Sequence, residues 1–197
     1  MPTTKTRMSR GRKRPVPGRE QILAVARAIG VRKGWSAVTI PSVAQEVGYT
    51  SPLLYEHFRN KEDLLTQIPV EAIAGFEKRL TEKLPEDSEA ALFTTVERYW
   101  NFMLKHTQLY RLANAMDGVL IDRRVVGPQS LSKALGDSVR PLLKESASDA
   151  ETLVDELWAM LYGMAALYLD RFAPFDLTKV TAAVVQLVSG ARTKHRT

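Results

Sequence analysis

The sequence predicts an all-α protein, on three observations. Apolar residues recur at spacings of three and four along almost the whole chain, which is typical of helices with one buried face. No segment alternates apolar and polar residues convincingly, so no strand is expected. Glycines, prolines and polar runs divide the chain into about nine such segments. The chain has 197 residues and 45% hydrophobic content, which is enough for one sizeable core or two small ones.

The first third of the chain predicts three short helices. An apolar stripe indicates the first helix over residues 19–33, and the same spacing indicates a second over residues 40–47. Gly48 ends the second helix, and either Thr50 or Ser51 caps the third. Three short helices with a tight turn between the last two make a helix-turn-helix unit.

The remaining chain continues at helical spacing between breaks at prolines and polar runs. The expected helices cover about residues 61–84, 89–106, 109–115, 131–144, 149–172 and 176–192. Pro69 falls inside the first of these, where a proline removes one backbone hydrogen bond and kinks the helix. We interpret Pro69 as a weak turn that lets the N-terminal helices tilt relative to the rest of the chain, with a static bend as the alternative.

Composition excludes several classes of protein. The chain has no cysteine, which excludes disulfides, thiolate zinc sites and a cysteine nucleophile. Its longest apolar run, from Leu157 to Leu169, is shorter than the roughly 20 residues that span a bilayer. The first residues are polar and basic and do not resemble a secretory signal. We therefore expect a cytoplasmic protein without a membrane segment.

The positive charge lies at the N-terminal end. Residues 1–68 hold 12 Lys and Arg against 5 Asp and Glu, a net charge of +7, whereas residues 69–197 hold 16 against 17, a net charge of −1. A basic front on a neutral body is the pattern expected of a part that binds a polyanion. The basic arm over residues 1–17 either contacts DNA or is a solvated tail.

The outer face of the third helix is the expected DNA-reading surface. At about 100° per residue, Leu54 and Phe58 share its inward face. The outward residues are then Pro52, Leu53, Glu56 and Arg59. Leu53 suits contact with a thymine methyl group. No lysine or arginine precedes Arg59 on this face, so no base preference is predicted.

The segment "VTIPSVAQEVGYTSPLLYEHFRNKEDLL", Val38 to Leu65, resembles the N-terminal domain of TetR-family transcriptional regulators. The resemblance rests on the apolar-Ala pair before the turn glycine, on the Leu-Tyr and His-Phe pairs of the third helix, and on the Lys-Glu start of the next helix. The segment "LWAMLYGMAALYL" from Leu157 is similar to a subgroup with a Trp-His-Gly signature, although Tyr162 stands at the histidine position.

The resemblance implies a DNA-binding set. Its expected phosphate contacts are Thr39, Tyr55, His57 and Lys61. Residues at the start of the third helix complete the set, and they are Thr50, Ser51, Pro52 and Leu53. Alternatives stay open at three positions: Tyr55 as a cover over the small core, His57 as a partly buried imidazole, and Lys61 as a solvated lysine.

The resemblance also implies a homodimer, and two C-terminal helices carry apolar stripes suited to a four-helix interface. The expected interface residues are Leu153, Leu157, Leu161, Met164, Tyr168, Val180, Val184, Leu187 and Val188. The alternative is that these stripes fill the core of the monomer.

TetR-family bodies hold a pocket for a small inducer, and such pockets are mostly apolar. The expected pocket residues are Phe76, Phe93, Trp100, Met103, Tyr110, Asn114, Trp158 and Tyr162. His106 and Gln108 are further possible polar anchors. Each residue taken alone more often belongs to the core than to a pocket.

These observations predict a ligand-responsive regulator, specifically a repressor that a small apolar or aromatic effector releases from palindromic operator DNA. The expected parts are the arm, a helix-turn-helix domain over residues 18–65, and a ligand-binding and dimerisation domain over residues 66–197. A helical enzyme and a nonspecific DNA-coating protein are the alternatives. No phosphate-binding loop, dinucleotide fingerprint or metal-ligand spacing is present in the sequence, so no cofactor or metal is expected.

Overall fold

The computed structural model describes residues 17–122, 129–143 and 147–194, and this part of the chain is helical with no strand. The α-helices are α1 (Arg19–Lys33), α2 (Ile40–Val47), α3 (Ser51–Tyr55), α4 (Lys61–Thr81), α5 (Ser88–Lys105), α6 (Thr107–Ala113), α7 (Gln129–Val139), α8 (Ala147–Leu169) and α9 (Leu177–Lys194). Two short 3₁₀ helices, η1 (Trp35–Ala37) and η2 (Arg140–Leu142), complete them. The predicted all-α class is confirmed. The predicted arm, apart from Pro17, lies outside the described residues.

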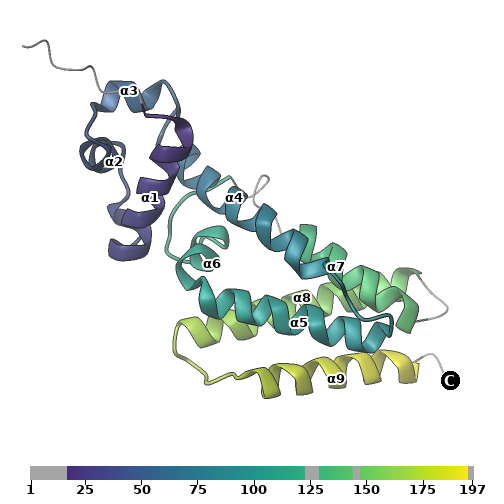
Figure 1. Cartoon of the computed structure of the whole chain (residues 1–197). Coiled ribbons are helices and arrows are strands. Elements are labelled where there is room, and N and C mark those ends of the chain that lie inside the picture. Colours follow the sequence, from purple (N-terminus) through teal and green to yellow (C-terminus); the bar gives the residue numbers. More distant parts are fainter. Residues whose placement is uncertain (1–16, 123–128, 144–146, 195–197) are drawn as a thin grey trace, which may run out of the picture.

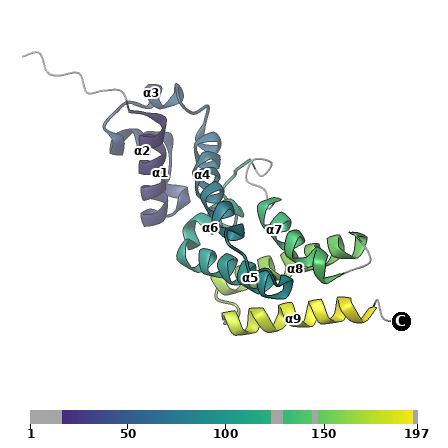
Figure 2. The same ribbon diagram turned by 45° about the vertical axis from the view of Figure 1, so that its right-hand side comes forward.

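The helices form two groups joined by α4. Figure 1 shows α1, α2 and α3 together at one end, which we call the head, and α5, α7, α8 and α9 stacked at the other, which we call the body. Figure 2 shows α4 running from the head into the body, and both views place α9 on the outer edge. Among the described helices, none is long and apolar enough to cross a membrane.

Each group has its own apolar core. The head core includes Ile22 of α1 and Val43 of α2, both fully buried. The body core is built around Trp100 of α5 and Leu157 of α8. The short helix α6 contributes to both, because Leu109 lies in the head core while Tyr110 lies in the body core. The α6 helix is therefore packed between the two groups.

Three helices end at least three residues earlier than the periodicity predicts, two of them for evident reasons. The α7 helix gives way to η2 at residue 140, where Pro141 has no N–H for a helical bond. The α8 helix ends at Leu169 because Arg171 has a φ of 61°, and the Phe172 N–H bonds back to the Leu167 carbonyl at 2.9 Å. The α4 helix runs through the buried Pro69 without interruption and ends at Thr81.

Candidate nucleic-acid interface

The turn between α2 and α3 depends on Gly48. Its backbone is left-handed, with φ 82° and ψ 34°, a conformation that glycine adopts without steric cost. The Gly48 and Tyr49 N–H groups both donate to the Ala44 carbonyl, at 3.0 and 2.9 Å, and close the end of α2. The chain is thereby turned tightly into α3.

The α3 helix has one anchored face and one open face. Leu54 is 0% exposed and Phe58, just after the helix, is 1% exposed, so both lie in the head core. On the other side Pro52 is exposed, Tyr55 is 55% exposed and Leu53 is half-buried. The inward and outward positions within the helix are therefore as the sequence predicts.

Glu56 and Arg59, which were also predicted to face outward, are both exposed, although α3 itself ends at Tyr55. After Tyr55 the chain tightens: Glu56 N–H donates to the Leu53 carbonyl at 3.2 Å, three residues back. Arg59 instead joins the start of α4, where its backbone N–H donates to Asp63 Oδ2 at 3.0 Å. Its side chain is 89% exposed.

Two predicted phosphate contacts lie at helix starts beside α3. Thr39 caps α2: its Oγ1 accepts the Ser42 N–H at 3.1 Å, while the Thr39 N–H donates to Ser42 Oγ at 2.9 Å. Lys61, the first residue of α4, donates from Nζ to the Ser36 carbonyl at 3.2 Å. The start of α4 is thereby held next to the start of α2.

The imidazole of His57 is only partly available. Its Nε2 atom is buried and has no hydrogen-bond partner among the described residues. The ring also packs against Phe58, with 6.4 Å between centroids. In this orientation only Nδ1 is left for a phosphate. This position remains a predicted DNA contact, now restricted to one ring nitrogen.

Arg19 is a positioning residue that the sequence analysis missed. From the start of α1 it donates Nη1 to the His57 carbonyl at 2.6 Å, and its guanidinium lies 4.4 Å from the centroid of the Phe58 ring. These contacts tie α1 to the chain that follows α3. The only signal in the sequence is a basic residue at the start of a helix, which is too common to single out.

The predicted ligand-pocket residues lie in the body, and several contact one another. Four are buried in the body core: Phe76, Trp100, Met103 and Tyr110. The other four are half-buried: Phe93, Asn114, Trp158 and Tyr162. Trp158 and Tyr162 stack with 5.6 Å between ring centroids, and Asn114 Nδ2 donates to the Tyr110 carbonyl at 2.9 Å.

A buried pair of phenols joins α5 to α6. The hydroxyl oxygens of Tyr99 and Tyr110 lie 2.5 Å apart in the body core. Burial, the main cause, raises the pKa of Tyr110 to about 12, and it raises the pKa of Tyr99 well above its ordinary value. Both groups are therefore neutral throughout the physiological range.

These raised pKa values predict a loss of stability at alkaline pH. The unfolded chain releases phenolic protons near pH 10, whereas folded Tyr110 holds its proton to about pH 12. Stability from this group is therefore complete below about pH 10 and falls by about 2–3 kcal/mol between pH 10 and 12. Urea unfolding at several pH values, without DNA, measures this loss. The double variant Tyr99→Phe with Tyr110→Phe should flatten the dependence, and Tyr55→Phe should not; equal slopes in all three proteins would contradict it.

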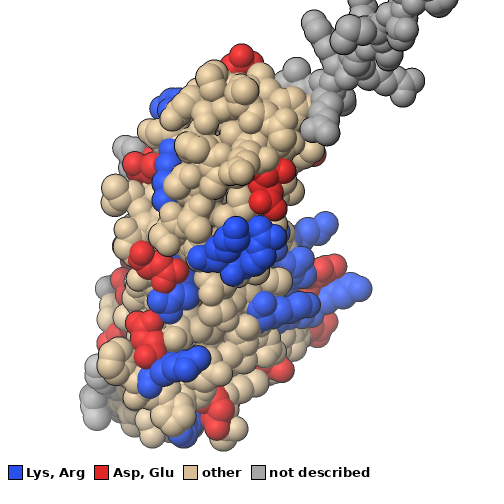
Figure 3. All heavy atoms as spheres, turned by 90° about the vertical axis from the view of Figure 1, so that its left-hand side faces the viewer, with Lys and Arg blue, Asp and Glu red and all other residues tan. Residues whose placement is uncertain are grey.

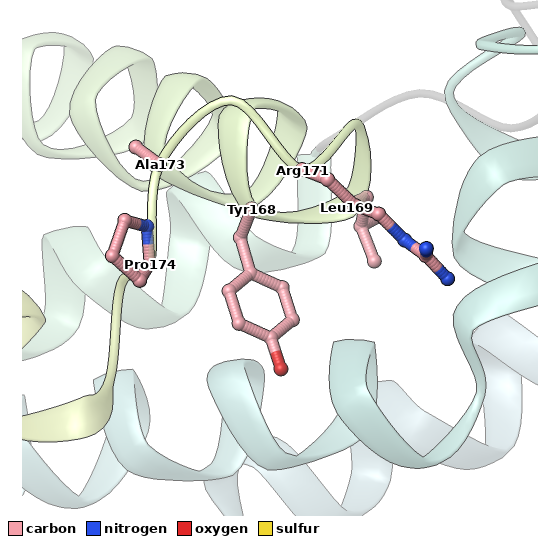
Figure 4. Close-up of a pocket in the computed structure, with 5 residues that line it drawn as sticks. All are labelled: Tyr168, Leu169, Arg171, Ala173 and Pro174. Atoms are coloured by element: carbon pink, nitrogen blue, oxygen red, sulfur yellow. The ribbon is translucent and has the colours of Figure 1, made fainter.

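A surface pocket lies where α8 meets the loop to α9 (Figure 4). Its volume is about 390 Å³, and its lining residues are Tyr168, Leu169, Arg171, Ala173 and Pro174. The Tyr168 ring reaches inward and meets Trp100 edge-on, with 5.8 Å between centroids. None of the five was predicted as a pocket residue, since Tyr168 was assigned to the dimer interface.

The predicted dimer interface needs correction. Six of its nine residues are at most 5% exposed because they fill the core of the monomer: Leu153, Leu157, Leu161, Val180, Val184 and Val188. Met164, Tyr168 and Leu187 are half-buried and pack against that core. The open faces of the same two helices carry small and apolar residues, which are Ala159, Gly163 and Leu167 on α8 and Ala182, Val185 and Ser189 on α9.

A helix-turn-helix with an anchored inner face and an open outer face, on an all-helical body, defines a DNA-binding transcriptional regulator. Residues 22–68 match the bacterial regulatory proteins of the tetR family. The N-terminal domain is thus similar to that of TetR-family transcriptional regulators, and the similar proteins described below are regulators.

Two regulators are similar in sequence. The chain is 25% identical to the HTH-type transcriptional activator FasR of Mycolicibacterium smegmatis, over 92% of this chain and 91% of FasR. It is 24% identical to the HTH-type transcriptional regulator AlkX of Mycobacterium tuberculosis, over 70% of this chain and 62% of AlkX. In fold it is similar to BioQ of Mycobacterium smegmatis, with a TM-score of 0.64 and 20% identity over 89% of this chain and 98% of BioQ. BioQ has also been solved with its double-stranded DNA operator.

Proposed function

We propose that the chain is a homodimeric repressor that binds a palindromic operator and is released by a small effector. The open face of α3 carries this proposal: Pro52 and Tyr55 are exposed while Leu54 and Phe58 hold the helix from behind. Such a face is built to enter a major groove. The similarity to BioQ, which was solved with its operator, supports DNA binding of this kind.

On DNA, the interface divides into base contacts and phosphate contacts. Leu53 and the residues before it face the base edges, where an apolar side chain meets thymine methyl groups. Thr39 and Lys61 lie at the starts of α2 and α4 and contact the sugar-phosphate backbone on the flanks. Phosphate contacts fix the register, so the short α3 needs few base contacts in each half-site.

Lys61 provides a test of the phosphate role. Lys61→Gln should reduce the slope of log affinity against log salt by about 0.9 for each half-site, because one fewer counterion is released. Fluorescence anisotropy on operator DNA at several salt concentrations measures this slope. Lys78→Gln is the matched control, since Lys78 is an exposed lysine near the other end of α4. An equal slope for Lys61→Gln and the parent protein would remove Lys61 from the interface.

The dimer supplies selectivity. The two heads of a dimer are held at a fixed separation, so both bind only where two half-sites have the matching spacing. The weak affinities of the two heads for their half-sites then combine into one stronger affinity for the whole operator. The open faces of α8 and α9 suit this association, because small side chains allow helices of two protomers to approach closely. Figures 1 and 2 show α9 on the outer edge of the body.

The effector acts through the body. The α6 helix connects the two groups: Trp35 Nε1 in the head donates to the Gln108 carbonyl at 2.8 Å, and Tyr110 two residues on bonds to Tyr99 in the body. Arg111 extends this link to the end of α8 through Asp170, at 2.9 Å. An apolar or aromatic effector that enters beside Tyr168 would repack these side chains and shift α6 against the head.

Pro69 is the second element of the proposed switch. Pro69→Ala restores a backbone N–H in the middle of α4 and should stiffen the link between head and body. The sequence has no cysteine, so Gln45→Cys introduces a single site for a spin label in each protomer. Gln45 is an exposed residue of α2. We expect Pro69→Ala to narrow the distribution of head-to-head distances measured by electron-electron double resonance. Gly75→Ala, which adds a methyl group to an exposed position of the same helix, is the control. A distribution as broad as that of the parent would show that Pro69 is a static bend.

The experiment that tests the whole proposal is footprinting on the DNA upstream of the chain's own gene. Protection limited to one inverted repeat supports a specific regulator, whereas protection without boundaries indicates a coating protein. A reporter behind that repeat gives the direction of control: repression predicts higher expression when the regulator is deleted. The relative FasR is named an activator, and lower expression on deletion would assign that direction here too.

A further inference from the structure

A second pocket lies at the junction of head and body, between α1 and the chain that links α5 to α6. Its volume is about 270 Å³, and the lining residues relevant here are Arg27, Val31, Lys105, His106, Gln108 and Leu109. It is separate from the pocket at the α8–α9 loop, with which it shares no residue. Both of the further polar anchors suggested by the sequence, His106 and Gln108, therefore lie here.

The pocket is basic and lacks an acidic counterpart. Arg27 comes from α1 and Lys105 ends α5, and neither has an ion-pair partner among the described residues. Burial lowers the pKa of His106, and the charges of Lys105, Arg27 and Arg79 lower it further. These three charged neighbours come from α5, α1 and α4, and all three are positive.

The position of the pocket separates it from the DNA-reading face. Arg19 marks the end of α1 next to α3, and Arg27 lies about 12 Å further along the same helix at 1.5 Å per residue. Figure 3 shows Lys and Arg side chains gathered at mid-height on the face that it draws, with acidic side chains beside some of them. A ligand in the pocket would contact Lys105 of α5 and Leu109 of α6 rather than α3.

The lining combines charge with apolar surface. Val31 is 52% exposed on α1, and Leu109 of α6 is 4% exposed at the base of the pocket. A ligand that satisfies both kinds of surface has a negative group at one end and a small apolar group at the other. The volume is at the small end of ligand pockets, which hold about 300–1,000 Å³.

We propose that this pocket binds a small organic carboxylate, with its negative group between Arg27 and Lys105 and its apolar part against Val31 and Leu109. The site goes beyond the proposed function, because it needs neither DNA nor the effector pocket. A bound carboxylate contacts α1 of the head and α5 of the body at once. It replaces the repulsion between Arg27 and Lys105 with two attractions and holds the head against the body.

The test uses the full chain without DNA and three probes at constant ionic strength: benzoate, benzyl alcohol and inorganic phosphate. Benzoate carries both features, benzyl alcohol lacks the charge, and phosphate lacks the apolar part. Isothermal titration calorimetry should show benzoate binding at least about tenfold more tightly than either of the others. Arg27→Gln and Lys105→Gln should each weaken benzoate about tenfold, whereas Lys33→Gln, an exposed lysine at the end of α1, should not.

The imidazole of His106 gives a second readout inside the pocket. Burial, and then its cationic neighbours, hold the pKa of His106 below its ordinary value. Bound benzoate should raise that pKa, as measured by proton NMR, because the carboxylate favours the imidazolium. The chain has three histidines, so His106→Gln assigns the signal.

Two results would overturn the site: benzoate affinity that is equal in the parent, Arg27→Gln and Lys105→Gln, or benzyl alcohol that binds as tightly as benzoate. Weaker operator binding by Arg27→Gln with a lower salt slope would instead assign Arg27 to DNA and would also remove the proposal. Operator affinity of the parent is measured separately, so failure of the carboxylate site and failure of the DNA-binding function are distinguishable.

Discussion

Replacing Leu54 with alanine should lower the free energy of unfolding by about 2–5 kcal/mol, the range for buried leucines. Leu54 is 0% exposed and belongs to the head core together with Phe58 and Val43. Its loss leaves a cavity under α3, which has only five residues and no long hydrogen-bonded ladder of its own. Operator binding should therefore be lost with it. Urea unfolding and anisotropy on operator DNA measure the two effects.

Leu53→Ala is the matched variant, because it changes the neighbouring leucine of the same helix. Leu53 is half-buried on the outward side, so its truncation should change stability by about 0.5 kcal/mol or less. It should nevertheless weaken operator binding about tenfold or more, since each half-site loses an apolar base contact. Unchanged operator affinity in Leu53→Ala would place the DNA on another surface of the head.

The head was predictable from sequence because its signals are local. Gly48 provides the left-handed turn, Thr39 caps α2, and the apolar spacing of α1 and α2 fits one buried face. Each signal acts over a few residues, and the bounds of α1 and α2 are those that the periodicity predicts. The contact from Arg19 to the His57 carbonyl joins residues that are 38 positions apart, so no pattern of neighbouring residues predicts it.

The body was harder to predict because its helices are apolar on more than one side. In α8, Leu157 and Leu161 face the core of the monomer, while Gly163 and Leu167 lie on the open side. A periodic pattern shows that a stripe is buried but not what covers it. The interface assignment therefore selected the more hydrophobic stripe, which is the core. The same limit applies to the pocket, since Trp100 and Met103 are core residues.

Replacing Gly163 with arginine should dissociate the proposed dimer. Beyond its chain neighbours and the backbone of its own helix, a Cβ atom at Gly163 would meet no atom of the described residues within 4 Å, so the folded monomer has room for a side chain there. In the proposed dimer the same position faces the partner's helices, where a buried unpaired charge is strongly unfavourable. We expect the dimer dissociation constant to rise by more than about 100-fold, equivalent to about 2.8 kcal/mol.

Gly163→Ala is the control, because it adds one methyl group and favours the helix by about 1 kcal/mol without adding charge. It should stay dimeric in analytical ultracentrifugation, while Gly163→Arg sediments as a monomer that unfolds with undiminished cooperativity. Operator affinity should fall with the dimer, because a single head meets only one half-site. A Gly163→Arg protein that remained dimeric and bound its operator would move the interface away from this face of α8, whatever the role of α3.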